Sequence, residues 1–520
     1  MAVEVMTSLE VNCATRTVLN SLLCPLRGGP FDHTVFPFVP IESVFIYRHP
    51  DSMSSNLSDF LPSWRLRQAM GHLLDYYPHL TGRFQRNVTD RTFELAKFGS
   101  GAQLLLASSN TTLDAIASLN TNTGRLTVEN LPGSGEQLTP PFNGTIEGVC
   151  RDPVLAIQHT RFQCGGVALG IRVHHMACDA YGFFQLVRDL AQIYRDLSGT
   201  DIDYLNLNAS LLSSPPEIHS YLSDPHSISA EERKTALQYP QSLFYIERES
   251  NPSGNAKPAV DLRQRTEPPI IGRMLRFSGS DLMALKARAS GPNPENWVST
   301  FEALTAYLYQ LVYKARIQYL VLRGASAESA TSKIWTGLWA SLNVRSKERL
   351  NLPPRYFPNA VHATCMQGSP QVLAHGNLCD VARSIHDMIR SEHKERILHT
   401  ARWIAAQPDK SLLRVNFEFG NGNFTVSQWS GFDMYNGVSF DVDGSGKPVH
   451  PSLVAPPFTE ISRVDGLAMI LSSEETVERV ASTKACPSSD LPSAIDVNLT
   501  LSEPLWEILD RSPDFRRLYR

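Results

Sequence analysis

The segment from about residue 213 to residue 268 interrupts the regular patterns that precede and follow it. It contains "SSPPEIHSYLSDPHSISAEERK" and "ESNPSGNAKPAVDLRQRTEPP", in which proline, serine and charged residues replace periodic apolar ones. A chain of 520 residues also exceeds what one hydrophobic core usually supports. We therefore expect two domains, residues 1–212 and residues 269–520, joined by a crossover at residues 213–268.

Helix and strand patterns alternate in the first half. "PSWRLRQAMGHLLDYYPHLTGRF" predicts an amphipathic helix, with Ser63 as its N-cap and Pro78 as its stop. Its apolar residues recur at helical spacing: Leu66, Ala69, Met70, Leu73 and Tyr77. Residues 155–162 and 167–175 have the pattern of two strands, and residues 180–197 that of the following helix.

The second half resumes the same alternation. "RMLRFSGSDLMALKARAS" predicts a strand and then a helix that begins near Asp281. Ser299 and Glu302 form a capping box ahead of a further helix that buries Leu304, Leu308 and Leu311. "KIWTGLWASLNV" and "SLLRVNFEF" predict later strands. The pattern is that of a two-domain mixed α/β chain.

Charge and composition exclude several classes of function. The net charge is -4 and there is no long basic run, so we expect no nucleic-acid partner. No stretch approaches 18 apolar residues and the N-terminus lacks a secretory pattern, so we expect no membrane partner and a cytoplasmic location. The eight cysteines show no metal-ligand spacing, so we expect reduced thiols and no metal.

The candidate catalytic residue lies in "GIRVHHMACDAYG", where His175 ends a predicted strand and Asp179 follows four positions later. Fifteen histidines would give about one such pair by chance, so the spacing alone is weak evidence. The small residues of the turn and the nearby Gly182 favour a turn that presents the imidazole to a cavity. Cys178 is interpreted as a packed side chain rather than a nucleophile. His174 alternates to the opposite side, where we expect packing or a backbone hydrogen bond.

Five segments carry a resemblance to a known family. "FDHTVFPFVPIESVFIYR" and "LRQAMGHLLDYYPHLTGRF" resemble two segments of its first half, and "HMACD" matches its HxxxD motif. "STFEALTAYLYQLVYKAR" and "NVRSKERLNLPPRYFPNAV" resemble the start of its second half and its Tyr-Phe-Gly-Asn region. The family is that of the BAHD acyltransferases, and the resemblance spans nearly the whole chain. It implies two chloramphenicol-acetyltransferase-like domains of mixed α/β structure, with the active site in a tunnel at their interface.

The resemblance also implies a chemistry. His175 would be the general base that takes the proton of a hydroxyl as this attacks the thioester of acyl-CoA, in a ternary complex without an acyl-enzyme. Asp179 would point away from the substrate and pair with Arg345 of the second half. We expect acetyl-CoA as cosubstrate, no permanently bound cofactor, a hydroxyl of a specialised metabolite as acceptor, and a monomer. Asn359 is expected to order the second-domain sheet.

The C-terminal motifs of the family are altered here. Its Asp-Phe-Gly-Trp-Gly motif appears as residues 442–446 without the aromatic residues, so we do not expect this loop to support the tunnel. Ser427 and Trp429 are separated by Gln428, and either side chain could supply a hydrogen bond to an oxyanion or line the CoA pocket. Together these features resemble the fungal branch of the family, which includes trichothecene 3-O-acetyltransferases.

Three alternatives stay open at this point. An enzyme of the condensation type, using carrier-bound acyl groups, also fits "HHMACD". An N-acyltransferase acting on an amine would use the same residues. A noncatalytic relative could bind a CoA ester or a partner through the tunnel.

Overall fold

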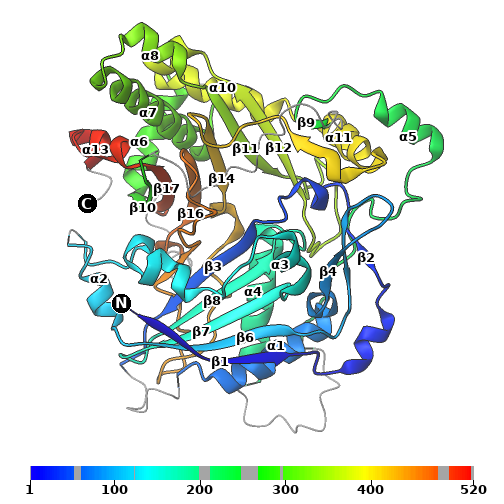
Figure 1. The fold of residues 1–520 in the computed structure, drawn as a ribbon. Helices are drawn as coiled ribbons and strands as arrows, with labels where there is room; N and C mark the ends of the chain where they lie inside the picture. Colours follow the sequence, from blue (N-terminus) through cyan, green and yellow to red (C-terminus); the bar gives the residue numbers. More distant parts are fainter. Residues whose placement is uncertain are drawn as a thin grey trace.

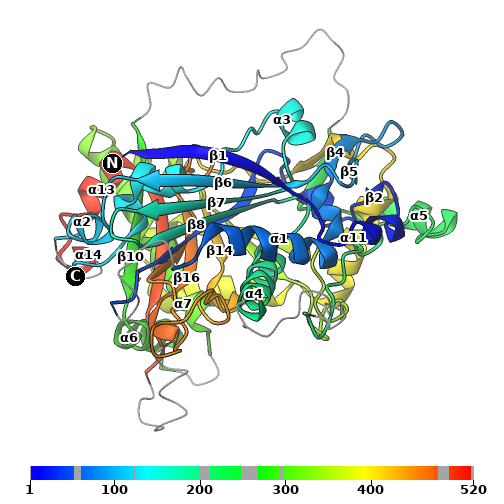
Figure 2. The ribbon, with the colours of Figure 1, turned by 90° about the horizontal axis from the view of Figure 1, so that it is seen from below.

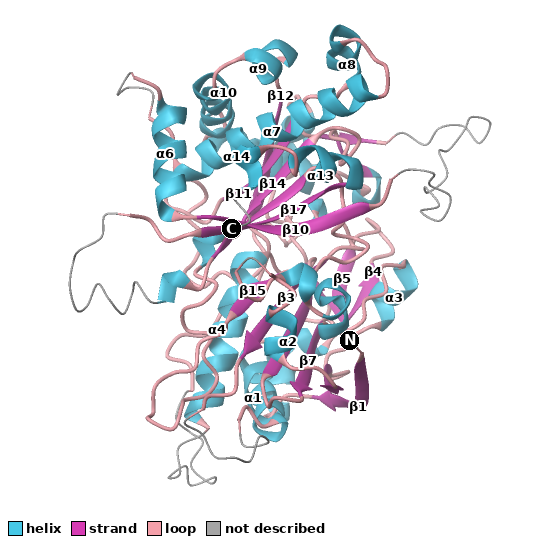
Figure 3. Ribbon diagram, turned by 90° about the vertical axis from the view of Figure 1, so that its left-hand side faces the viewer, coloured by secondary structure: helices cyan, strands magenta, loops and turns pink. Residues whose placement is uncertain are grey.

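The computed structural model describes residues 2–51, 60–121, 123–197, 211–247, 268–292, 297–477 and 491–516. Two six-stranded sheets, each with its own helices, form the two halves of the molecule (Figure 1). Figure 3 shows the two halves one above the other, with the second sheet and its helices over the first. The expected mixed α/β fold with two domains is confirmed.

The first sheet has the order β1-β6-β7-β8-β3-β15. Only β6 and β7 pair in parallel within it. Figure 2 shows helices α1 and α4 side by side on one face of this sheet. The bounds are β1 Val3–Val11, β3 Pro40–Tyr47, β6 Ala102–Ser109, β7 Leu155–Phe162, β8 Val167–His174, β15 Leu453–Ala455, α1 Ser63–Tyr76 and α4 Ala180–Asp196.

The second sheet has the order β10-β17-β16-β14-β11-β12 and includes two parallel pairs, β11 with β14 and β14 with β16. Helix α7 begins at the capping box of Ser299 and Glu302 and packs against α6 and α10. It buries Leu304 and Leu308 as expected, whereas Leu311 is only partly buried. The bounds are β10 Ile270–Phe277, β11 Gly337–Asn343, β12 Val361–Gln367, β14 Phe424–Gln428, β16 Leu467–Ser472, β17 Ile495–Ser502, α6 Gly279–Ser290, α7 Thr300–Leu322, α10 Leu378–Arg390 and α13 Glu503–Leu509.

Shorter elements join these layers. The remaining strands are β2 Leu26–Arg27, β4 Arg83–Arg86, β5 Phe93–Ala96, β9 Phe244–Ile246 and β13 Leu413–Val415. The remaining α-helices are α2 Leu113–Ala117, α3 Ile146–Arg151, α5 Ala230–Leu237, α8 Ala327–Lys333, α9 Pro370–His375, α11 Lys394–Ala406 and α14 Pro513–Arg516. The 3₁₀ turns are η1 Arg16–Ser21, η2 Asp32–Thr34, η3 Pro78–Thr81, η4 Val128–Asn130, η5 Pro132–Leu138, η7 Lys410–Leu412 and η8 Ser430–Phe432.

Two local predictions are wrong. Ser63 is the first helical residue of α1 and not its cap, because Pro62 occupies the cap position and makes no side-chain bond there. "SLLRVNFEF" forms only the three-residue strand β13, which pairs with β9 outside both main sheets. The turn at Pro78 does end α1, as expected.

The two halves are connected by more of the chain than the single crossover that the sequence suggests. The crossover contains α5 and β9, whereas its residues 248–267 lie outside the described residues. Strand β15 comes from the C-terminal part of the chain but pairs with β3 in the first sheet. The division at residues 212 and 269 stays a prediction, and this exchanged strand shows that the chain crosses back at least once.

Among the described helices, none combines the length and the apolar character that a membrane crossing needs.

Candidate active site

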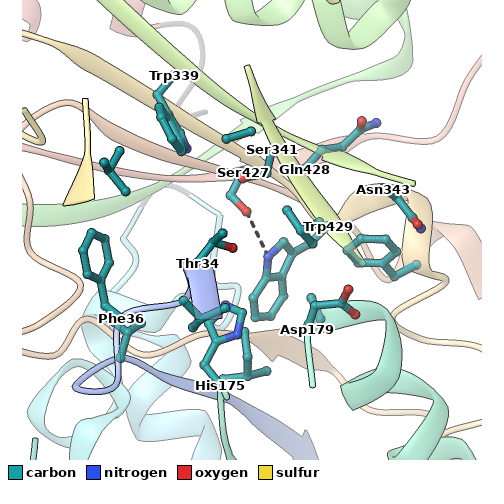
Figure 4. A pocket seen from close by; sticks show the side chains of 18 of the residues that line it. Thr34, Phe36, His175, Asp179, Trp339, Ser341, Asn343, Ser427, Gln428 and Trp429 are labelled. Atoms are coloured by element: carbon teal, nitrogen blue, oxygen red, sulfur yellow. Dashed lines mark hydrogen bonds between the residues drawn. The ribbon is translucent and has the colours of Figure 1, made fainter. Parts of the chain in front are cut away.

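A cavity of about 430 Å³ lies between the two sheets, and both halves contribute its walls. The first half supplies His175 at the end of β8 and the segment that follows η2. The second half supplies side chains of β11, β12 and β14. Figure 4 shows His175 on one wall, with Ser427 and Trp429 facing it across the space. The residues that line the cavity include Thr34, Phe36, His175, Asp179, Phe244, Trp339, Ser341, Asn343, Arg345, Phe419, Ser427, Gln428, Trp429 and Phe432.

His175 is placed where a general base is needed. Strand β8 is buried along its whole length and ends at His174, so His175 is the first residue beyond the sheet. Its Nδ1 is buried, while the ring lines the cavity, which leaves Nε2 as the nitrogen for the open space. Burial lowers the pKa of His175 from its ordinary value of 6.5, opposed by its own carbonyl group and by the charge of Asp179. The imidazole is therefore neutral near pH 7 and can accept a proton.

Asp179 is occupied by bonds that hold the structure together. It is the N-cap of α4, where its Oδ1 accepts from the amide of Gly182 at 3.1 Å. Arg345 donates to both of its oxygens, at 2.8 and 2.9 Å, and the amide of Ala360 donates to Oδ2 at 2.9 Å. The structure thus pairs the two residues that the sequence suggested as partners.

Gly182 allows the two halves to meet closely at this helix. A Cβ atom at this position would lie 2.2 Å from the carbonyl oxygen of Phe357, which belongs to the second half. Real Cβ atoms do not approach backbone oxygens so closely, so any side chain would force the loop of Phe357 away from α4. Since that loop precedes Asn359 and Ala360, the glycine helps to keep their contacts with the first half.

Ser427 and Trp429 form one unit on the opposite wall. The indole Nε1 of Trp429 donates to Ser427 Oγ at 3.1 Å, drawn as the dashed line in Figure 4. The indole proton is therefore already used, whereas the hydroxyl of Ser427 keeps its own proton for another acceptor. Of the two candidates for an oxyanion donor, the geometry favours Ser427, with Trp429 orienting it.

Cys178 and His174 lie away from the cavity. Cys178 is fully buried, and burial raises the pKa of its thiol well above the ordinary value, so the thiolate is disfavoured. His174 packs against Phe84, with ring centroids 4.7 Å apart, and its Nδ1 accepts from the amide of Met176 at 3.3 Å. Both side chains agree with the packing roles expected from the sequence.

The expectation for Asn359 needs correction. This residue precedes β12, but its side chain donates to the carbonyl of His175 at 2.9 Å and to Asp32 Oδ1 at 2.8 Å, both in the first half. It therefore supports the candidate base rather than the second sheet. Sequence reasoning missed Asp32 as well, although both residues lie in segments that carried the family resemblance.

One side of the cavity is aromatic. Phe36 and Trp339 lie there, on the side away from Asp179 and Asn343 (Figure 4). Phe419 contacts both rings edge-on, with centroids 5.8 Å from Phe36 and 5.4 Å from Trp339. We refer to Phe36, Trp339 and Phe419 as the aromatic end. The altered loop at residues 442–446 contributes no side chain to the cavity wall.

Comparisons with known proteins agree with this arrangement. The model of the Transferase family matches residues 1–490. A hydroxycinnamoyl-CoA:piscidic acid hydroxycinnamoyltransferase of Actaea racemosa is 25% identical over 441 residues, which cover 81% of this chain and 85% of the relative. A hydroxycinnamoyl-CoA:5-hydroxyanthranilate N-hydroxycinnamoyltransferase of Avena sativa is 24% identical over 340 residues, covering 64% and 66%. The crystal structure of F. sporotrichioides TRI101 with coenzyme A and T-2 shares the fold, with a TM-score of 0.65, 15% identity and coverage of 95% and 99%.

Proposed function

The chain belongs to the Transferase family, the BAHD acyltransferases of the sequence resemblance, and we propose that it transfers an acyl group from a CoA thioester to a hydroxyl of a specialised metabolite. It is an enzyme that transfers acyl groups. The observation that carries the proposal is the position of His175 at the cavity wall, with Nδ1 buried and Nε2 left for the acceptor. Burial also lowers the pKa of His175, which favours the neutral imidazole that a base requires.

The proposed reaction needs one proton carrier. Nε2 of His175 takes the proton of the acceptor hydroxyl while its oxygen attacks the thioester carbon, forming a tetrahedral intermediate. Ser427 donates a hydrogen bond to the oxyanion that develops on the carbonyl oxygen. When the C–S bond breaks, the imidazolium returns the proton to the thiolate of CoA. The products are the ester and free CoA, and His175 is neutral again.

Asp179 and Arg345 take no part in these proton transfers. Each carboxylate oxygen of Asp179 already accepts two hydrogen bonds, from Arg345, Gly182 and Ala360. A carboxylate offers about four lone-pair directions, so no position remains for a substrate proton. In this proposal the pair holds the turn after β8 in place, and Gly182 lets the second half approach it.

The donor in this proposal is acetyl-CoA, and the aromatic end holds the apolar part of the acceptor. Support for a CoA thioester as donor comes from the shared fold with a protein crystallised with coenzyme A and T-2, and the acetyl group follows from the sequence resemblance to trichothecene 3-O-acetyltransferases. The second candidate donor is hydroxycinnamoyl-CoA, which the name of the Actaea racemosa relative contains. With that donor the aromatic end would hold the acyl group instead of the acceptor, because aromatic rings stack on one another. The Avena sativa relative, named for N-acylation, makes an amine the alternative acceptor.

The deciding experiment measures release of free CoA thiol with a thiol reagent. The purified enzyme is incubated with acetyl-, benzoyl- or p-coumaroyl-CoA and a panel of apolar alcohols and amines. We expect thiol release with acetyl-CoA and an alcohol, and none with His175→Ala. His226→Ala, which removes an exposed histidine of the crossover, is the matched control and should retain activity. Faster turnover with an amine or an aromatic donor would replace the proposed acceptor or donor, and equal activity of His175→Ala would overturn the mechanism.

A further inference from the structure

Asn359 lies behind His175 and connects it to a buried carboxylate. Its Nδ2 carries two protons, and these are donated to the carbonyl of His175 at 2.9 Å and to Asp32 Oδ1 at 2.8 Å. The backbone amide of Asn359 also donates to Asp32 Oδ1, at 3.1 Å. Asn359 is 1% exposed and Asp32 is 5% exposed, so water does not compete for these bonds.

These contacts fix which way the amide of Asn359 points. The hydrogen-bond partners of an asparagine side chain decide on which side its oxygen and its nitrogen lie. Here both partners of Nδ2 are oxygen acceptors, a carbonyl and a carboxylate, and only the NH₂ group can serve them. The oxygen Oδ1 must therefore point to the other side.

Asn359 and His175 each also have one buried polar side-chain atom that is left over. Asn359 Oδ1 and His175 Nδ1 are both buried, and among the described residues neither has a partner that meets full hydrogen-bond geometry. The two side chains nevertheless interact: burial lowers the pKa of His175, and the Asn359 side chain is one of the groups that raise it again. The carbonyls of His175 and Cys178 also raise the pKa of His175.

We propose that Asp32 and Asn359 set the tautomer of His175, which makes Asn359 a positioning residue for the proposed acyl transfer on which this inference rests. In this proposal the two left-over atoms meet, so that Asn359 Oδ1 lies beside Nδ1 and favours the tautomer that carries its proton there. Nε2 then keeps its lone pair toward the cavity and can act as a base. If the amide turned over, its NH₂ would face Nδ1, favour the Nε2–H tautomer and remove the base.

In this proposal Asp32 fixes the orientation of the side-chain amide of Asn359. Its carboxylate accepts hydrogen bonds from the backbone amide of Gly29, at 2.7 Å, and from both nitrogens of Asn359. Asp32 donates in none of these bonds, so the NH₂ group of Asn359 has to face it. Asp32 and His175 belong to the first half and Asn359 to the second. The working tautomer therefore depends on the two halves being closed on each other.

The test reads the tautomer directly by nitrogen NMR of protein labelled with ¹⁵N-histidine, above pH 7. The resonances of His175 are identified by their loss in His175→Ala. We expect wild type to show a protonated Nδ1 and a bare Nε2. Asn359→Ala should give a mixture of tautomers and a kcat lower by about 10- to 100-fold, with a KM for acyl-CoA within about twofold of wild type.

Asp32→Asn provides a second route to the same state. It retains the size of the side chain but replaces the carboxylate with a neutral and weaker acceptor for the NH₂ of Asn359, so we expect a partial shift of tautomer and an intermediate kcat. Asn421→Ala, at an exposed asparagine, is the control and should change neither measurement. Because Asn359→Ala can weaken the interface, the thermal midpoint is recorded for each variant.

Each result decides the proposal. A lower kcat with an unchanged Nδ1–H tautomer would show a merely structural role, and a mixed tautomer with full kcat would show that the tautomer is not used. Either outcome overturns it. If wild type has the expected tautomer, Asn359→Ala loses it, and no acyl-CoA supports thiol release, the positioning stands and the proposed function fails.

Discussion

The guanidinium of Arg345 donates two hydrogen bonds, of 2.8 and 2.9 Å, to the carboxylate of Asp179 across the boundary between the two halves. The side chains are 10% and 3% exposed. Arg345 also donates to the carbonyl of Pro358 at 2.7 Å, so it ties the turn of His175 to the loop that contains Asn359. A buried charge pair of this kind is costly to break from one side only.

The first prediction concerns this pair. Asp179→Ala and Arg345→Ala should each lower the free energy of unfolding by roughly 3 to 5 kcal/mol, because each leaves a buried charge without its partner. The double variant should lose clearly less unfolding free energy than the two single variants added together, because the second substitution no longer leaves a buried charge without its partner. Urea denaturation of the four proteins measures this.

The control for this cycle is an exposed pair. Arg383 and Asp387 lie one turn apart on α10, 3.3 Å from each other, with side chains 47% and 62% exposed. Arg383→Ala should change stability by no more than about 0.5 kcal/mol. Strictly additive losses for Asp179 and Arg345 would show that the pair is not coupled. An Asp179→Ala variant with full stability and no turnover would instead place Asp179 in the chemistry.

The second prediction concerns the pH dependence of turnover. His175 must be neutral to accept a proton, and its pKa lies below 6.5 because burial outweighs the opposing effects of its own carbonyl, Asp179, Asn359 and Cys178. As pH falls, kcat/KM should therefore stay constant through pH 7 and decline only below pH 6.5. A decline that is already half complete above pH 7 would contradict the assignment.

The rate lost by removing His175 gives a separate check. General base catalysis typically contributes about 10²- to 10⁴-fold, so His175→Ala should lose at least that much turnover while keeping its unfolding midpoint and its affinity for acyl-CoA. A variant with more than about a tenth of wild-type activity would exclude His175 as the base.

The third prediction excludes a covalent intermediate. Cys178 is fully buried with a raised thiol pKa, so it should not be acylated. Mass spectrometry of enzyme with acyl-CoA alone should show no added acyl mass, and double-reciprocal plots for the two substrates should intersect. Cys178→Ala should retain turnover. A stoichiometric adduct on Cys178, together with parallel plots, would establish a thiol nucleophile instead.

The residues of the site that could be predicted from the sequence are those that lie close together along the chain. His175, Asp179 and Gly182 lie within eight consecutive positions, between the end of β8 and the first turn of α4, and the alternation of the preceding strand places the imidazole at its end. Arg345 needed the family resemblance, because its bond to Asp179 spans 166 positions and no local pattern indicates it.

The contacts that were missed all join distant segments. Asn359 bonds to Asp32 across 327 positions, and Asp32 is a short polar residue in a 3₁₀ turn that resembles an ordinary loop. The aromatic end is likewise assembled from three separate segments, around Phe36, Trp339 and Phe419. Strand β15 is only three residues long, too short for its alternation to show which sheet it joins. Such features depend on tertiary packing and not on periodicity.

The fourth prediction concerns stability in acid. His79 is 2% exposed, and burial lowers its pKa to about 3, whereas an unfolded histidine has a pKa near 6.5. Below pH 6.5 the unfolded state takes up a proton that the folded state does not, so folding becomes less favourable as pH falls. Between pH 6.5 and 4.5 this one residue should cost roughly 2 to 3 kcal/mol. His79→Phe should therefore lose that much less stability on acidification than wild type in urea titrations, and identical losses would contradict the prediction.

The fifth prediction asks which substrate the aromatic end holds. Trp339 is 9% exposed and lines the cavity, whereas Trp335, four positions earlier, is 56% exposed and lies outside it. If the apolar part of the acceptor packs on Trp339, then Trp339→Ala should raise KM for the acceptor by about 5- to 30-fold, a loss of about 1 to 2 kcal/mol, and leave KM for acetyl-CoA within about twofold. Trp335→Ala is the matched control and should change neither constant, while Trp339→Phe keeps an aromatic surface and should have a smaller effect. The opposite result, a raised KM for the acyl-CoA with an unchanged acceptor KM, would assign the aromatic end to the acyl group and favour an aromatic donor over acetyl-CoA.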